Sequence, residues 1–196
     1  MGYKLEIFVD MDGALAVVDE DEMCARLDQF YAGDECAFEG FFDDLEVCEW
    51  FHNFIDKIHS KLGVRARIHI VSSVMEPLFS VSAKKSWLGR NVSFPIDFVG
   101  FPISGKQEKS DYVSGGAGVA SNWVLFDDYT HNLKMWEDAG GVSVKVLNGC
   151  NGKSGSWKGL TVCEDDRFDD VWLDILHRVQ NGEGSPRKFD AYNVRY

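Results

Sequence analysis

The sequence predicts an α/β protein, a three-layer sandwich in which helices cover both faces of a mostly parallel sheet. Short runs rich in β-branched and aromatic residues alternate along the chain with longer segments whose apolar residues recur at the helical period. Several of the strand-like runs end in acidic or hydroxyl residues, which is typical of parallel sheets that bind ligands at the carboxyl ends of their strands. At 196 residues the chain is long enough for one medium-sized domain with a small insertion.

The first expected strand covers 4–9, "KLEIFV". An acidic and aromatic stretch, 14–44, comes next, in which "DEDEMCARLDQFY" favours a helix and "FEGFFDD" favours a turn. We interpret this stretch as a small helical cap inserted after the first strand. The resulting division is a core domain made of 1–13 and 45–196 and a cap made of 14–44.

The middle of the chain repeats the alternation of helices and strands. A helix is expected over 45–63, because its apolar residues have a helical period and a glycine ends it. The run "VRARIHIVSS" at 64–73 predicts the second strand. A helix over much of 76–90 and a third strand near 96–101 follow.

The last part of the chain begins with a segment, 102–118, that we interpret as a polar loop. The fourth strand is expected at 122–128, "NWVLFDD", and a helix closed by two glycines at 130–141. The fifth strand is expected at 142–147, and an amphipathic helix at 167–182.

Charge and composition exclude several classes of partner. Lys and Arg total 20 against 32 Asp and Glu, and the formal charge of -12 repels a phosphate backbone, so we expect no extended nucleic acid as a ligand. No apolar run approaches the roughly 18 residues that span a bilayer, so we expect no membrane association. The N-terminus has no secretory pattern and the five cysteines lack metal-ligand spacing, which favours a cytoplasmic protein with reduced thiols. The oligomeric state is not determined, and a homodimer stays open.

Four groups of polar residues lie at the strand ends or between them. They are Asp10, Asp12 and Gly13 in "DMDG", Ser72 and Ser73 in "IVSS", Lys106 and Lys109 in "GKQEKSD", and Asp127 and Asp128 in "LFDD". Each group by itself has the composition of an ordinary turn or loop. Their joint order at successive strand ends predicts a metal-dependent site for a phosphoryl group.

In this order the four groups resemble the motifs of the haloacid dehalogenase (HAD) superfamily of phosphohydrolases: DxDG, a strand-end Ser or Thr, a Lys, and DD. The resemblance covers most of the chain and implies a Rossmann-like core. It favours Lys109 over Lys106 as the motif lysine, because "KSDYV" begins at Lys109 as the family's third motif would. Lys106 lies in a glycine-bounded loop and is the weaker candidate.

The resemblance implies Mg²⁺ as the cofactor. This ion prefers octahedral oxygen ligands and usually combines one or two carboxylates with water and substrate phosphate. Asp10 and Asp127 are expected to supply carboxylates from adjacent strand ends, and Asp12 its backbone carbonyl. Asp128 is expected to act through water or by holding Lys109.

The same resemblance implies roles in catalysis. Asp10 is expected to attack phosphorus and form an aspartyl-phosphate, while Asp12 protonates the leaving oxygen and later deprotonates the hydrolytic water. Ser72 and Lys109 are expected to hold the phosphoryl oxygens, together with backbone N–H groups around Asp12, Gly13 and Ser73.

The stretch that follows the acid pair is similar to the 5'(3')-deoxyribonucleotidase branch of this superfamily. In that branch an Asn, a Trp and two glycines follow the DD motif, and here they are Asn132, Trp136, Gly140 and Gly141. The branch implies a helical cap and nucleoside monophosphates as substrates. Core packing and a helix stop are the ordinary explanations for the tryptophan and the glycines.

Alternatives to this function remain open. One is hydrolysis of another small phosphorylated metabolite, and another is a non-catalytic module that only accepts a phosphoryl group. Aromatic residues of the cap could stack on a nucleobase or simply form the core of the cap; they are Phe30, Tyr31, Phe38, Phe41 and Phe42.

Overall fold

The computed structural model describes residues 5–75, 79–102, 107–148 and 155–182. Its six strands form one parallel sheet in the order β3-β2-β1-β4-β5-β6. The strands are β1 (Leu5–Val9), β2 (Ala66–Val74), β3 (Asp97–Pro102), β4 (Trp123–Asp127), β5 (Val142–Val146) and β6 (Leu160–Val162). The predicted α/β class with a parallel sheet is confirmed.

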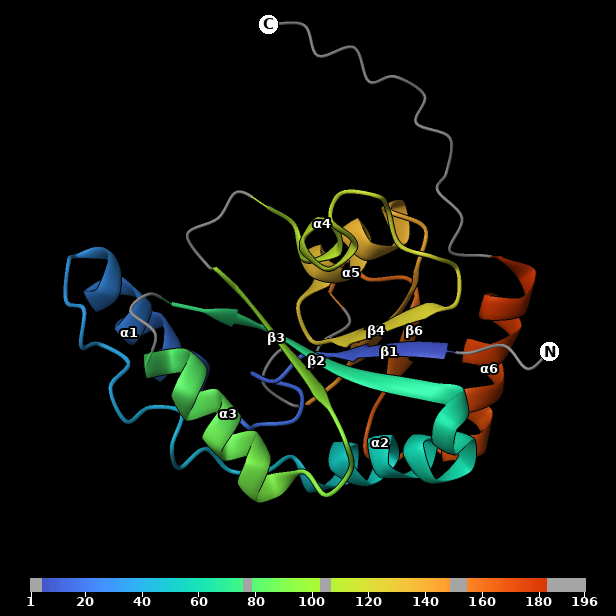
Figure 1. Ribbon diagram of the computed structural model, residues 1–196, viewed down its shortest axis with the longest axis horizontal. Helices are drawn as coiled ribbons and strands as arrows, with labels where there is room; N and C mark the ends of the chain where they lie inside the picture. The colour runs from blue at the N-terminus through green and yellow to red at the C-terminus, as the bar shows by residue number, and fades with distance from the viewer. Residues whose placement is uncertain (1–4, 76–78, 103–106, 149–154, 183–196) are drawn as a thin grey trace, which may run out of the picture.

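Helices cover both faces of the sheet and complete the three layers (Figure 1). They are α1 (Glu20–Tyr31), α2 (Glu49–Leu62), α3 (Phe79–Asn91), α4 (Lys109–Ser114), α5 (Thr130–Asp138) and α6 (Phe168–Asn181). Helices α2, α3 and α6 pack on one face, and α4 and α5 on the other. Helix α1 lies beyond the carboxyl end of β1 (Figure 1).

Strand β1 lies at the centre of the sheet and is buried by both helical layers. Ile7 and Val9 belong to the larger hydrophobic core, between the sheet and helices α2, α3 and α6. Phe8 belongs to the smaller core, between the sheet and α5. Side chains alternate between the two faces of a strand, so this short apolar run serves two cores at once. The strand is therefore packed on both faces up to Val9, the residue before Asp10.

The segment between β1 and α2 supplies most of a separate hydrophobic cluster, which we call the cap cluster. It contains Val18, Ala37, Phe38, Phe41, Phe42 and Met75, with Met23, Leu27, Phe30, Leu45 and Ala83 packed against it. The first residues of the segment, Ala14, Leu15 and Ala16, do not belong to the cap cluster but are buried in the larger core of the sheet. The division into core and cap at the predicted boundaries stays a prediction.

Two elements were not expected from the sequence. The three-residue strand β6 extends the sheet beyond β5, and it is too short for an alternation pattern to show. Helix α4 lies within the segment interpreted as a polar loop, and its six residues are fewer than two turns. The second strand also starts later than expected, because Gly63–Arg65 forms a single 3-10 turn.

Within the part of the chain that the structure describes, no helix is both long enough and apolar enough to cross a membrane.

Candidate active site

The sheet places two acidic residues side by side at its centre. Strand β1 pairs in parallel with β2 on one side and with β4 on the other, so the chain winds outward in both directions from the β1/β4 pair. Asp10 follows β1 directly, and Asp127 is the last residue of β4. The crevice at such a switch point is where open α/β sheets bind ligands. The expectation that the first and fourth strands are neighbours is confirmed.

Three carboxylates converge at this point. Asp10, Asp127 and Asp128 are all buried, and each offers an oxygen that lies within 4.8 Å of the oxygens offered by the others. Lys109, at the start of α4, reaches into the cluster with its ammonium group 3.1 Å from Asp10 and 2.6 Å from Asp127. The sequence-predicted lysine therefore contacts the predicted nucleophile, while Lys106 lies outside the described residues.

The buried cluster contains more acidic groups than basic ones, three carboxyl groups with one lysine. Burial raises the pKa of Asp10 well above its usual range, Lys109 opposes this shift, and the charges of Asp127, Asp12 and Asp128 add to it. Burial alone would lower the pKa of Lys109, but the adjacent Asp10 and Asp127 carboxylates raise it above its ordinary value. The two carboxylates therefore favour the charged form of Lys109, whose single ammonium group faces three carboxyl groups.

The donor set fits a hard divalent cation. Three carboxylates with one lysine leave net negative charge in a buried pocket, and oxygen ligands are those that Mg²⁺ prefers. The side chains of Asp10, Asp127 and Asp128 are the groups that could hold the ion. The expected contribution from the backbone carbonyl of Asp12 stays a prediction.

Polar neighbours fix the orientation of Asp127. Its Oδ1 accepts from the backbone N–H of Tyr129 at 2.8 Å, and its Oδ2 accepts from the Asn132 amide at 2.9 Å. Asn132 belongs to the pattern that resembled the nucleotidase branch, and the structure places it against the acid pair. Ligands of a metal are commonly held by such outer hydrogen bonds.

Gly13 brings the backbone unusually close to Asp128. A Cβ atom at Gly13 would lie 2.1 Å from Asp128 Oδ2, and the glycine has a φ of 77°. The Asn148 amide donates to the Gly13 carbonyl and lies 3.4 Å from Asp128 Oδ2. Glycine is therefore required here both by the backbone conformation and by space.

The predicted acid and base, Asp12, lies beside a second buried cation that the sequence analysis did not identify. The ammonium group of Lys84, on α3, forms an ion pair with Asp12 Oδ2 and donates to Ser72 Oγ and to the Ser73 carbonyl, each at 2.8 Å. Ser72 Oγ also lies 3.2 Å from Asp12 Oδ2, within hydrogen-bond distance. The predicted residues Asp12, Ser72 and Ser73 are thus brought together, and Lys84 joins them.

The burial of Lys84 could have been predicted from the spacing of the apolar residues in α3. Among the side chains of this helix that the structure describes, the buried ones are Ser80, Lys84, Trp87 and Leu88, which lie on one helical face. In "SAKKSWL" the two lysines resemble a solvated pair, but only Lys85 is exposed. The spacing from Trp87 and Leu88 would have placed Lys84 on the buried face.

A cavity of about 450 Å³ opens beside the acids toward α1. Asp12, Gly13 and Asp128 line its core side; Val18, Glu20, Met23 and Cys24 line its cap side, and Tyr129 lies at its rim. Its size is within the range of small-molecule pockets, about 300–1,000 Å³. A ligand whose phosphoryl group meets the carboxylate cluster would extend into this space.

Most aromatic residues of the cap are core residues. Phe38, Phe41 and Phe42 are buried and pack on one another with ring centroids 5.0–5.8 Å apart. Tyr31 is exposed and Phe30 packs against the cap cluster. The exposed aromatic ring that lines the cavity is Tyr129, which was not among the predicted candidates.

The tryptophan and the second glycine of the branch-like pattern have structural roles. Trp136 is fully buried on α5 and its indole N–H donates to the Trp123 carbonyl at 3.3 Å. A Cβ atom on Gly141 would lie 2.3 Å from the Trp136 indole nitrogen. Because these residues are explained by packing, they do not by themselves indicate a nucleotide.

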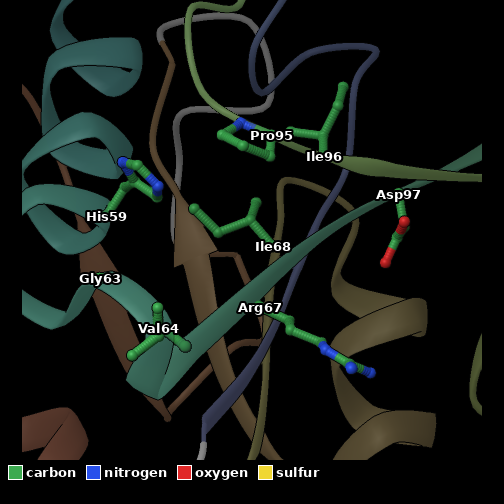
Figure 2. A pocket seen from close by; sticks show the side chains of 9 residues that line it. His59, Gly63, Val64, Arg67, Ile68, Pro95, Ile96 and Asp97 are labelled. Atoms are coloured by element: carbon green, nitrogen blue, oxygen red, sulfur yellow. The ribbon is translucent and has the colours of Figure 1, made fainter.

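A second hollow, of about 320 Å³, lies at the opposite end of the sheet (Figure 2). Figure 2 shows His59, Val64, Arg67 and Asp97 around it, near the amino ends of β2 and β3. None of the sequence-predicted site residues lines it. The carboxyl end of the sheet is therefore the candidate active site.

Comparison with known proteins bears on the fold. No protein-family profile matches the chain, and no curated protein sequence does. The structure is similar to a HAD-superfamily hydrolase from Ehrlichia chaffeensis, with a TM-score of 0.52, 11% identity, and coverage of 91% of this chain and 99% of that one.

Two further solved structures show the same likeness. A haloacid dehalogenase-like hydrolase from Streptococcus pneumoniae has a TM-score of 0.53, 9% identity, and coverage of 88% of this chain and 99% of that one. A candidate β-phosphoglucomutase from Thermotoga maritima has a TM-score of 0.53, 14% identity, and coverage of 86% and 99%. The chain therefore has the fold of the HAD-superfamily hydrolases.

Proposed function

We propose that the protein is a Mg²⁺-dependent phosphomonoester hydrolase that acts through an aspartyl-phosphate on Asp10. The observation that supports this most directly is the buried cluster of Asp10, Asp127 and Asp128 with Lys109 inserted between the first two. A buried acidic cluster with a single lysine suits a Mg²⁺ ion that binds together with a phosphoryl group. The HAD-like fold supports the same reaction class.

In the first step an Asp10 carboxylate oxygen attacks phosphorus in line with the leaving oxygen. The new O–P bond forms while the bond from phosphorus to the leaving oxygen breaks, and Asp12 delivers a proton to that oxygen. Lys109 lies 3.1 Å from Asp10 and can neutralise charge on the phosphoryl oxygens. The products are an alcohol and the aspartyl-phosphate.

In the second step water attacks the phosphorus of the aspartyl-phosphate. Asp12 takes the proton from that water, the bond from phosphorus to Asp10 breaks, and inorganic phosphate is released. Asp10 recovers its carboxylate and Asp12 its proton, so the cycle closes. A bound Mg²⁺ ion supplies charge neutralisation at the phosphoryl oxygens, and Asp10, Asp127 and Asp128 would hold it.

The proposed substrate class is the nucleoside monophosphates, with a 5'(3')-deoxyribonucleotidase activity. The sequence similarity after the acid pair and the size of the cavity support it. The exposed Tyr129 ring, together with Val18 and Met23, offers a surface on which a nucleobase can stack. Glu20 in the same lining can accept hydrogen bonds from a sugar or base.

The test is steady-state release of phosphate from a panel of monophosphates. Deoxynucleoside and ribonucleoside monophosphates, sugar phosphates and p-nitrophenyl phosphate are compared with Mg²⁺ and with EDTA. We expect turnover that requires the metal and is fastest with deoxynucleotides. Equal or faster turnover of sugar phosphates would reject the nucleotidase and retain the phosphatase, the alternative that the sequence left open.

The nucleophile is tested by Asp10→Asn, with Asp97→Asn at the opposite end of the sheet as the matched control. The amide cannot form the acyl-phosphate, so kcat is expected to fall at least about 1,000-fold, in the range known for nucleophile knockouts. The control is expected to keep full activity. An active Asp10→Asn variant would reject the mechanism, and a wild-type protein that is phosphorylated without turnover would favour the phospho-acceptor module.

A further inference from the structure

The buried ammonium of Lys84 is the strongest feature that the proposed reaction leaves unused. Lys84 is fully buried, although lysine is rarely so unless its charge is paired. Its partners are the Asp12 carboxylate, the Ser72 hydroxyl and the Ser73 carbonyl. A lysine that only packed against the core would not need three oxygen acceptors from the loop and strand that form the site.

The two oxygens of Asp12 have different surroundings. Oδ2 receives Lys84 and lies 3.2 Å from the Ser72 hydroxyl. Oδ1 has no hydrogen-bond partner among the residues that the structure describes, and it is buried. A carboxylate that carries a proton to a leaving group and later removes one from water needs one oxygen with an uncommitted lone pair. Lys84 therefore fixes one oxygen and leaves the other available.

The Lys84 ammonium also lies against the cap cluster. Its nitrogen is 4.3 Å from the centroid of the Phe42 ring, and Phe42 is fully buried. A cation over an aromatic face is stabilised by the ring's quadrupole, more so when both are shielded from water. Lys84 thus connects the cap cluster to Asp12 through a single side chain.

We propose that Lys84 is a positioning residue that holds Asp12 in the orientation for proton transfer through Oδ1. This inference rests on the proposed phosphatase function, because it assigns Lys84 a role in that reaction. Lys84 acts through Asp12 and does not itself contact the transferred phosphoryl group.

The variant that tests this is Lys84→Met, which keeps an unbranched apolar stem one atom shorter and removes the charge. Its matched control is Lys85→Met, the exposed neighbour on the same helix. General acid catalysis contributes about 100- to 10,000-fold. Because Lys84→Met misplaces Asp12 but does not remove it, only part of that contribution is lost, and kcat on the best nucleoside monophosphate is expected to fall at least about 30-fold. The KM is expected to change less than about 3-fold, since substrate binding does not use Lys84.

Two readouts separate positioning from a merely structural role. On p-nitrophenyl phosphate, whose leaving group departs without protonation, the formation of phosphoenzyme is expected to be nearly unchanged. The second step still needs Asp12 as a base, so acid-quenched Lys84→Met is expected to contain more phosphoenzyme than the wild type. In an Asp12→Asn background, the additional loss caused by Lys84→Met is expected to shrink to less than about 3-fold, because coupled residues are not additive.

The outcomes that overturn the inference are distinct from failure of the proposed function. If the wild type hydrolyses none of the phosphates, the phosphatase proposal fails. If the wild type is active and Lys84→Met keeps its kcat, or loses activity equally in the Asp12→Asn background, Lys84 does not act through Asp12. A rise in KM with unchanged kcat would make Lys84 a phosphate-binding residue instead. If circular dichroism shows that Lys84→Met does not fold, the same measurements are made on Lys84→Gln. The glutamine amide has no charge but can still donate hydrogen bonds to Ser72 and Ser73.

Discussion

Replacing Gly13 by alanine tests whether the strand-end turn and the acid cluster form one reaction centre. The glycine has a φ of 77°, a conformation that costs an L-residue about 1–2 kcal/mol. Its new Cβ would also lie 2.1 Å from Asp128 Oδ2 and 2.8 Å from Asp128 Cγ, whereas real Cβ contacts are essentially never under 3.0 Å. The substitution must therefore push Asp128 or the turn away by about 0.9 Å.

The magnitude follows from these two terms. Displacement of a catalytic group by about 1 Å can cost about 100-fold, so kcat/KM of Gly13→Ala is expected to fall by about that factor. In free energy this corresponds to about 2.7 kcal/mol of transition-state stabilisation. The concentration of Mg²⁺ that gives half-maximal activity is expected to rise as well, because Asp128 is one of the candidate ligands.

Gly40→Ala is the matched control. Gly40 has a φ of 73°, and no atom of the described chain lies within 4 Å of a Cβ built on it. Gly40→Ala is expected to lose about 1–2 kcal/mol of unfolding free energy, measured by urea denaturation. Gly13→Ala is expected to lose at least as much, because its Cβ also displaces Asp128 or the turn. Only Gly13→Ala is expected to lose activity and metal response. Equal kcat/KM values for the two variants would refute the placement of the reaction centre between Gly13 and Asp128.

Two further predictions concern stability. Burial lowers the pKa of His52, with the charge of Asp56 opposing the shift, so the unfolded chain binds this proton more readily than the folded one. The contribution of neutral His52 to the unfolding free energy is therefore present above pH 6.5 and is lost as pH falls through the lowered pKa. His52→Gln is expected to make the unfolding free energy, measured by urea denaturation at a series of pH values, depend less on pH in this range. The same pH dependence in wild type and variant would reject this cause. Gly141→Ala places a Cβ 2.3 Å from the buried Trp136 indole nitrogen and is expected to cost about 1–3 kcal/mol by overpacking. Gly89→Ala, with open space around it in the described chain, is the control, and equal denaturation midpoints for the two would contradict the packing argument.

The order of the polar groups could be read from the sequence because each follows an apolar strand. "IFVDMDG" and "VLFDD" combine a buried run with acids, and parallel strands that end at one edge bring such acids together. The pairing of β1 with β4 then places Asp10 beside Asp127, as expected. The roles of these residues stay predictions until the variants are measured.

Short elements could not be predicted, because periodicity needs length. Strand β6 has three residues and helix α4 has six, so neither shows a repeating pattern. Their stability comes from pairing with β5 and from packing beside α5, which are tertiary contacts. The interpretation of 102–118 as a loop is wrong over Lys109–Ser114 for this reason.

The sequence by itself determined the alternation of strands and helices and the identity of the acids at the strand ends, because local apolar patterns and turn residues encode both. Only the tertiary structure decided which lysine forms an ion pair with which aspartate. Lys109 comes from a helix too short to predict, and Lys84 comes from a lysine pair of which one member is buried and the other exposed. The physical reason is that burial of an ammonium group depends on acceptors from distant segments, here Asp12 from the turn after β1 and Ser72 from β2.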